Sequence, residues 1–266
     1  MSHTTAQIVL GIDVGASGIK GALVDVRQGT LVSERLRLLT PQPATPKSVT
    51  KVIVELVEKL EYEGDVVGCG FPAIIKKGVA WSAANISKKW IGQDVEALFS
   101  EATGKRFTVL NDADAAGIAE MQFGKGIGHE GTVILITIGS GLGSAVFTDG
   151  HLVRNTELGH FYLHGMPAEQ YASNNARKRD GLSWKEWAKR FSEYLDHLDR
   201  LFSPDLVILG GGGSKKWDEF HKHLKTKLNV VPATLGNEAG IIGAAWCARP
   251  EIWRTTAVPP RARQQL

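Results

Sequence analysis

The spacing of apolar residues along the chain predicts short strands that alternate with amphipathic helices. Short apolar runs, which are typical of buried strands, occur at 8–13, 66–71, 107–110, 132–138 and 206–209. Helical spacing or helix-forming composition follows them over 47–61, 91–104, 114–123, 183–201, 214–227 and 237–247. This alternation predicts an α/β protein.

One pattern occurs twice, about 125 residues apart. The strand 8–13 runs into the glycine-rich turn "DVGASGIKG" and returns as strands at 22–26 and 31–38, and the strand 132–138 runs into "GSGLGS" before another strand at 145–147. We therefore expect two related lobes with a cleft between them. The expected division is 1–111 for the first lobe and 112–248 for the second, with its last helix packing back on the first lobe, followed by a flexible tail at 249–266.

Charge and cysteine content narrow the classes of protein. The formal net charge of +3 resides in the tail, where four arginines face one glutamate, so the rest of the chain is neutral and nucleic acid is not an expected partner. The two cysteines, Cys69 and Cys247, form no C-x-x-C pair, which argues against a zinc site built on thiolates. With no apolar leader and no run of membrane-spanning length, we expect a cytoplasmic protein.

Three glycine-rich turns are candidates for binding phosphate. In "DVGASGIK", residues 13–20, backbone N–H groups can point together toward an anion, Ser17 and Lys20 can add contacts, and Asp13 can hold a divalent cation through water. "TIGSGLGS", residues 137–144, repeats this design, and "LGGGGS", residues 209–214, ends a strand and opens a helix. Any one of them can be an ordinary turn that needs glycine for its backbone, but three together favour a phosphate chain or nucleotide.

Two groups of polar residues are candidates for chemistry on the acceptor. Asp112 follows the strand 107–110 and can accept a proton from an attacking hydroxyl, whereas Asp114 is expected to cap the following helix. Farther along, Glu157, His160 and Glu169 can bind a polyhydroxylated ligand. The alternatives, which the residues alone leave open, are ordinary loop contacts or a metal site that includes His164.

Taken together, these motifs resemble the ROK family of sugar kinases, within the actin/hexokinase-like superfamily. The segments that carry the resemblance are "DVGASGIKGA", "LNDADAAG", "TIGSGLGSA", "ELGH" and "GGGGS", and they span 8–247. The resemblance implies two lobes of the ribonuclease H-like kind with the substrate cleft between them. "SAANISKKWIGQD", "LGHFYLHG" and "LSWKEWAKRF" are similar to the subgroup whose phosphoryl donor is inorganic polyphosphate and whose acceptor is glucose.

The resemblance implies a role for each matching position. Asp112 is the expected general base for the sugar 6-hydroxyl, and the expected glucose ligands are Asn85, Asn111, Asp112, Glu157, His160 and Glu169. The expected donor side is formed by Asp13, Gly15, Ala16, Ser17, Gly18, Lys20, Thr137, Gly139, Ser140, Gly141, Gly143, Gly211 and Gly212. Mg²⁺ is expected to arrive bound to the donor. Asp13 is expected to hold it through water, and no direct protein ligand is expected.

The chain departs from the family pattern at two places. The family's cysteine-rich zinc segment is replaced by "LHGMPAEQYAS", which keeps only the glutamate, Glu169, so no zinc is expected. Ala16 stands where the family usually has glycine, which is tolerable only if its φ is negative.

The choice of donor rests on the subgroup resemblance. Basic residues at 76–77, 88–89, 177–179 and on the helix expected over 214–227 permit a polyanion path, although such runs are more often solvated surfaces. The alternatives are an ATP-dependent hexokinase acting on glucose or mannose, and a sugar-responsive regulator of the same family that lacks its DNA-binding domain. The resemblance also implies a homodimer.

Overall fold

The protein forms two mixed sheets, seen here in a computed structural model that describes residues 7–84 and 86–249. The expected glucose ligand Asn85 and the tail beyond Arg249 therefore lie outside the described residues. The first sheet has the order β3-β2-β1-β5-β8, with β4 paired to β2. Its strands are β1 (Ile8–Val14), β2 (Ile19–Asp25), β3 (Thr30–Leu31), β4 (Leu36–Leu38), β5 (Val66–Phe71) and β8 (Arg106–Asn111).

The second sheet repeats the plan of the first. Its order is β11-β10-β9-β14-β15, and the strands are β9 (Thr132–Ile138), β10 (Leu142–Thr148), β11 (His151–Val153), β14 (Leu206–Gly210) and β15 (Val230–Pro232). In both sheets an antiparallel hairpin, β1–β2 or β9–β10, precedes two parallel strands. The duplication expected from the glycine-rich turns is therefore present in the strand order.

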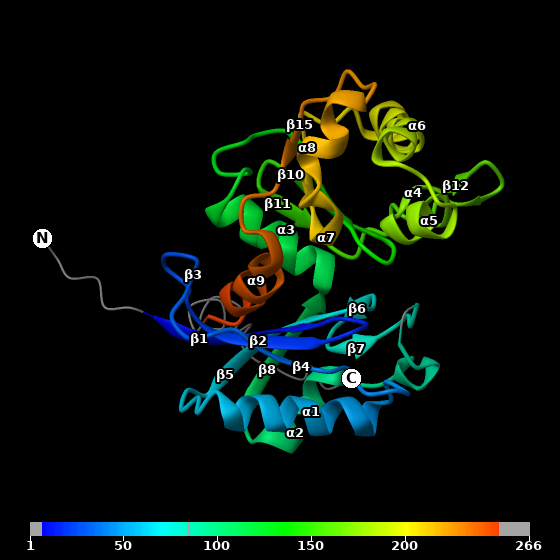
Figure 1. Cartoon of the computed structure of the whole chain (residues 1–266). Coiled ribbons are helices and arrows are strands. Elements are labelled where there is room, and N and C mark those ends of the chain that lie inside the picture. The colour runs from blue at the N-terminus through cyan, green and yellow to red at the C-terminus, as the bar shows by residue number, and fades with distance from the viewer. Residues whose placement is uncertain (1–6, 85, 250–266) are drawn as a thin grey trace, which may run out of the picture.

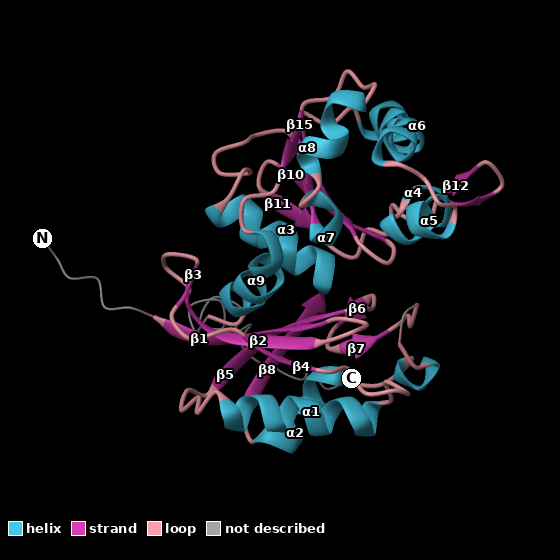
Figure 2. Cartoon of the chain, in the orientation of Figure 1, coloured by secondary structure: helices cyan, strands magenta, loops and turns pink. Residues whose placement is uncertain are grey.

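Helices cover both faces of each sheet (Figures 1 and 2). α1 (Pro46–Lys59) and α2 (Val95–Thr103) cover the outer face of the first sheet, and α6 (Trp184–Phe202) covers the outer face of the second. α3 (Asp112–Phe123) and α9 (Ala239–Cys247) lie between the two sheets. Among the described residues, no helix is long and apolar enough to cross a membrane.

α9 approaches its neighbours at backbone distance because glycines face it. A Cβ on Gly68 of β5 would lie 1.8 Å from the carbonyl oxygen of Ala244, and one on Gly243 would lie 1.8 Å from that of Ala115 in α3. Side chains at these two positions would push the helix away. The last helix of the chain is thereby fixed against both the first sheet and α3.

Smaller elements complete the two lobes. On the first lobe they are β6 (Ile75–Lys76), β7 (Val79–Ala80) and η1 (Lys88–Trp90). On the second they are β12 (Tyr162–Leu163), β13 (Met166–Pro167), α4 (Ala168–Ala172), α5 (Asn174–Arg179), α7 (Gly211–Ser214), α8 (Trp217–Phe220), η2 (His221–His223) and η3 (Gly236–Glu238).

The helix expected over 214–227 is wrong. The segment contains α7, α8 and η2, and it is non-helical beyond His223, where the N–H of Lys225 donates to Ser192 Oγ of α6 at 2.8 Å. Trp217, Phe220 and Leu224 have the spacing of a helix face and do pack against the α6 core. They reach it from a broken chain, so the five lysines of this segment do not share one helix.

The strand expected over 31–38 is also interrupted. Between β3 and β4, the N–H of Leu23 donates to the Ser33 side-chain oxygen at 3.0 Å instead of to a backbone carbonyl. A side chain that replaces a ladder partner ends the regular pairing there.

Candidate active site

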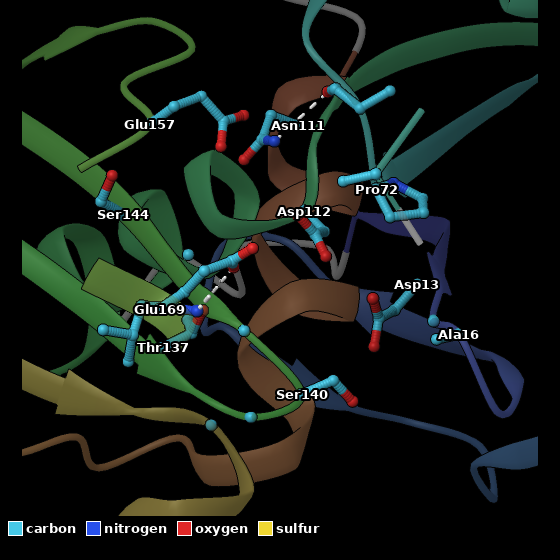
Figure 3. Close-up of a pocket in the computed structure, with 18 of the residues that line it drawn as sticks. Asp13, Ala16, Pro72, Asn111, Asp112, Thr137, Ser140, Ser144, Glu157 and Glu169 are labelled. Carbon is cyan, nitrogen blue, oxygen red and sulfur yellow. Dashed lines mark hydrogen bonds between the residues drawn. The ribbon is translucent and has the colours of Figure 1, made fainter. Parts of the chain in front are cut away.

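A cavity of about 440 Å³ lies where the two lobes meet (Figure 3). Both glycine-rich hairpin turns and the start of α3 contribute to its wall. The expected residues that line it are Asp13, Gly15, Ala16, Ser17, Lys20, Asn111, Asp112, Thr137, Gly139, Ser140, Gly141, Gly143, Glu157, His160, Glu169, Gly211 and Gly212. Gly18 is not among the residues that line the cavity, and its expected role on the donor side stays a prediction.

The first turn is held by side chains from β4 and the residue positions after it. The Gly15 N–H donates to the Gly18 carbonyl at 3.0 Å, which closes the turn. From outside, Thr40 Oγ1 donates to the Gly15 carbonyl at 2.6 Å, and Arg37 Nη2 donates to the Ser17 carbonyl at 2.9 Å. Gly18 is needed for this contact, because a Cβ there would lie 2.5 Å from Arg37 Nε.

Ala16 fits the turn without strain. It is not among the residues with positive φ, so its methyl group meets the condition that the sequence set for this position. Beside the turn, Lys20 Nζ donates to Asp13 Oδ2 at 2.8 Å. The cavity therefore has a carboxylate and an ammonium group in contact at the end of β1.

The second and third turns also depend on glycine. The Gly139 N–H donates to the Gly141 carbonyl at 3.0 Å. A Cβ on Gly141 would lie 2.2 Å from Glu169 Oε2, so a side chain there would displace this carboxylate. Gly211 has a φ of +76°, and a Cβ on it would lie 2.8 Å from the backbone of Ile138, so only glycine suits the start of α7.

Asp112 lies in the middle of the cavity, with Asp13 on one side and Glu157 and Glu169 on the other (Figure 3). It is the first residue of α3, and its Oδ1 accepts from the Ala113 N–H at 2.9 Å. Burial, followed by the negative charges of Asp13 and Glu157, raises the pKa of Asp112 to about 7. A carboxylate with this pKa can exchange a proton with a bound hydroxyl near neutral pH.

The cap of α3 is Asn111, and the expectation that Asp114 caps it is wrong. The Asn111 side-chain oxygen accepts from the N–H groups of Ala113 and Asp114, and its amide donates to the Ala73 carbonyl at 3.2 Å. Asp114 lies in the first turn and points away from these N–H groups to accept from the Asn155 N–H at 2.9 Å. Asn111, Asp112 and Asp114 are all of residue types that can cap a helix, and the path of the backbone decides which of them does so.

Glu157, His160 and Glu169 converge on one side of the cavity. His160 lies between the two carboxylates, with its Nδ1 3.7 Å from Glu157 Oε2 and its Nε2 3.7 Å from Glu169 Oε1. Burial is the main cause of a raised pKa at Glu157, which His160 partly offsets and Glu169 reinforces. The three side chains offer alternating acceptors and donors, which suits a ligand with several hydroxyl groups.

His164 lies apart from this cluster. Its Nε2 is 2.6 Å from Glu193 of α6, and it does not line the cavity. Across residues 7–84 and 86–249, no group of three or more His, Cys, Asp or Glu side chains has the arrangement of a metal site.

Several lining residues were not among those expected individually from the sequence, although four of them lie within quoted motifs. They are Pro72, Ala73, Ser82, Ala84, Leu142, Ser144, Thr156 and Asn237. Pro72 closes β5, at the carboxyl edge where ligands bind in α/β sheets, and this position was a usable signal. Ser144 is only 1% exposed, and its Oγ donates to the Thr156 carbonyl at 2.6 Å and accepts from the Leu158 N–H at 2.9 Å, so it fixes the residues on either side of Glu157.

Comparison with known proteins gives a consistent result. The model of the ROK family matches residues 9–178. Polyphosphate glucokinase of Mycobacterium tuberculosis is 44% identical over 243 residues, which are 91% of either chain, and that of Mycobacterium leprae is 41% identical over 91% of this chain and 75% of its own.

Two solved structures extend this likeness to the whole fold. The inorganic polyphosphate/ATP-glucomannokinase from Arthrobacter sp. strain KM superposes with a TM-score of 0.87 at 49% identity, over 90% of this chain and 96% of that one. A ROK family glucokinase from Streptomyces griseus, in complex with glucose and AMPPNP, gives 0.78 at 25% identity, over 91% and 99%.

Proposed function

This chain belongs to the ROK family, and on that premise we propose that it transfers a phosphoryl group from inorganic polyphosphate to the 6-hydroxyl of glucose. The product is glucose 6-phosphate. The fold is the expected actin/hexokinase-like one, and similarity over nearly the whole chain to enzymes named for this reaction supports the substrates. The observation that carries the proposal is the position of Asp112, which lies in one cavity with the phosphate turns and the sugar-binding cluster.

On the acceptor side, Asp112 is the proposed general base. Its carboxylate takes the proton of the 6-hydroxyl as the oxygen attacks the terminal phosphorus, an effect worth roughly 10²–10⁴ in rate. The bond from that phosphorus to the bridging oxygen breaks, and polyphosphate shortened by one phosphate leaves. Glu157, His160 and Glu169 would bind the remaining hydroxyls and hold the sugar in line for transfer. Asn111 has one amide hydrogen left for the sugar after its cap and its bond to Ala73.

On the donor side, the turns at 15–18 and 139–141 would hold the terminal phosphates through backbone N–H groups. Kinases of this kind typically need a divalent metal, and we propose Mg²⁺. The cavity fits this ion, because Asp13 places a carboxylate beside the turns, where it can accept hydrogen bonds from the waters that Mg²⁺ retains. When bound, the ion neutralises charge that develops on the transferred phosphoryl group.

The residues that would guide polyphosphate into the cavity are spread over several segments of the chain. Several basic residues expected along it already have partners, since Arg179 pairs with Asp180 at 2.7 Å, Lys216 pairs with Glu219 at 2.8 Å, and Arg177 lies 4.2 Å above the Trp184 ring. ATP is a second candidate donor, because Gly211, Gly212 and Asn237 offer a further wall of the same cavity. The name of the Arthrobacter enzyme includes both donors.

Three further features belong to this proposal. The two lobes comprise residues 1–111 and 112–248. The protein acts as a homodimer, and it acts in the cytoplasm. Resemblance to the family supports the dimer, and the unpaired state of Cys69 and Cys247 fits a reducing compartment. A purely regulatory role is disfavoured, because sugar sensing alone does not require Asp112 beside two phosphate turns.

The test compares donors under matched conditions. Purified protein is assayed for glucose 6-phosphate with Mg²⁺ and either polyphosphate or ATP, alongside Asp112→Ala and a sample treated with EDTA. We expect turnover with polyphosphate to exceed that with ATP, to disappear with EDTA and return with Mg²⁺, and to fall by about 10²–10⁴ in the variant. Turnover with ATP alone would reject the donor, and no turnover of glucose with either donor would reject the acceptor.

A further inference from the structure

Three segments that line the cavity are joined to one another at a point outside it. Asn155 lies after β11 in the second lobe, and its side chain makes two hydrogen bonds to Ile75 of β6 in the first lobe. The Ile75 N–H donates to Asn155 Oδ1 at 2.8 Å, and Asn155 Nδ2 donates to the Ile75 carbonyl at 3.0 Å. The backbone N–H of Asn155 donates to Asp114 Oδ2 of α3 at 2.9 Å. We call Asn155, Ile75 and Asp114 the junction.

Each member of the junction is two residues from a group that faces the substrate cavity. Glu157 follows Asn155, Asp112 precedes Asp114, and Ala73 precedes Ile75. A two-residue link is short enough that a shift at the junction moves the lining residue. The junction therefore sets the separation between the catalytic carboxylate and the sugar-binding Glu157.

The residues are specialised for this contact. Asn155 has a φ of +58°, a conformation that asparagine adopts more readily than most other residues. Its side-chain amide donates to the Ile75 carbonyl and accepts from the Ile75 N–H, as the backbone of a neighbouring strand does in a sheet. Asp114 is 2% exposed, so its carboxylate is withdrawn from water to receive the Asn155 N–H. A buried carboxylate costs free energy unless it has partners, so its presence requires a compensating role.

We infer that Asn155 and Asp114 are positioning residues for the acceptor sugar, acting through Glu157 and Asp112. The inference rests on the proposed glucose kinase function and adds to it residues that never touch the substrate. Neither hydrogen-bonds to the phosphate turns at 15–18 and 139–141. A change at the junction should therefore alter the KM for glucose and leave the KM for the donor unchanged.

The sharpest variant is Asn155→Gly. Glycine tolerates the positive φ and retains the N–H to Asp114, so only the two bonds to Ile75 are removed. We expect the KM for glucose to rise about tenfold or more, since misplacement by an ångström is costly, while the KM for polyphosphate stays within about twofold. Asp114→Ala should act in the same direction, and Asp114→Asn, which retains an oxygen acceptor, should restore a glucose KM close to wild type.

The matched control is Asp205→Ala. It removes another long-range bond to a backbone N–H, that of Thr132 at 2.7 Å, at the end of β9 remote from the cavity. It should lower the melting temperature without changing the KM for glucose relative to the KM for polyphosphate. The inference is overturned if folded Asn155→Gly keeps the wild-type glucose KM, or if both KM values rise together. Inactive wild-type protein would instead reject the glucose kinase proposal, and the junction inference with it.

Discussion

At the scale of single residues, the surroundings of Asp112 give its carboxylate a pKa that suits the role of base that we propose for it. Its pKa is raised to about 7, first by burial and then by the charges of Asp13 and Glu157. Asp114, two residues later, also has its pKa raised to about 7 by burial, yet it faces Asn155 rather than the cavity. Geometry, rather than pKa, distinguishes the carboxylate that we propose as the base from the one that we propose as a positioning group.

The raised pKa of Asp112 predicts a pH dependence. The base must be ionised to accept a proton, so activity should grow as pH rises through the raised pKa and level off above it. We expect kcat/KM for glucose to fall about tenfold per pH unit below about 7, which places the acid limb well above the range of an exposed aspartate. Steady-state rates at saturating polyphosphate from pH 5 to 9 would measure it.

The donor's own ionisation is the competing cause of such a limb. Repeating the profile with donors of different terminal pKa separates the two, because a limb that belongs to Asp112 does not move with the donor. A profile that is flat between pH 5 and 8 would contradict the assignment of Asp112 as the base.

At the scale of elements, the crossing of α3 and α9 determines how the cavity is built. α3 carries Asp112 at its first position, and α9 holds α3 against the first sheet through contacts at Gly243 and Gly68. Helices that approach this closely do so because small residues let their backbones meet. The orientation of the Asp112 carboxylate therefore depends on a helix nearly at the end of the described chain.

Gly243→Ala tests this dependence. A methyl group would lie 1.8 Å from the Ala115 carbonyl oxygen, so α9 must move, and we expect a loss of about 1–3 kcal/mol in the free energy of unfolding. Gly212→Ala is the matched control, because nothing lies within 4 Å of its Cβ position and stability should change little. Urea unfolding of both variants measures the difference, and equal midpoints would show that the helix contact adapts to the extra atom.

At the scale of the molecule, the distribution of charge predicts that salt affects the binding of the two proposed substrates differently. The chain outside the arginine-containing tail is neutral, so a polyanion must be attracted by local groups around the cleft rather than by net charge. Such attraction is screened by salt, whereas binding of an uncharged sugar is not.

We therefore predict that the KM for polyphosphate rises severalfold between about 50 and 500 mM salt, while the KM for glucose stays nearly constant. Initial rates across a potassium chloride series at fixed free Mg²⁺ would measure both. A parallel rise in both constants would indicate a general effect of salt on the fold, and no rise in either would mean that donor binding does not depend on exposed cations.

Local patterns in the sequence predicted the plan of the molecule and most of the residues that line its cavity. Apolar runs and glycine-rich turns predicted most strands, because the residue types that a buried strand and a tight turn require can be recognised within a few positions. The second parallel strand of the first lobe, β5, was predicted to the residue at Val66–Phe71. The expected donor and sugar residues, apart from Gly18 and the undescribed Asn85, line one cavity. Many of them lie in turns or helix starts that directly follow β1, β8, β9 and β14, and ligands bind at such carboxyl ends of strands in α/β sheets.

Contacts between distant segments and the exact path of the backbone became clear only in three dimensions. The sequence predicted Asp114 as the cap of α3, whereas Asn111 caps it, because both residue types can cap and the choice depends on the backbone path. It predicted a helix at 214–227, where the Ser192 side chain in α6 instead binds a backbone N–H and the chain turns away. The Asn155–Ile75 contact joins residues 80 positions apart, and no local pattern records such a pair because its bonds exist only once the lobes have met.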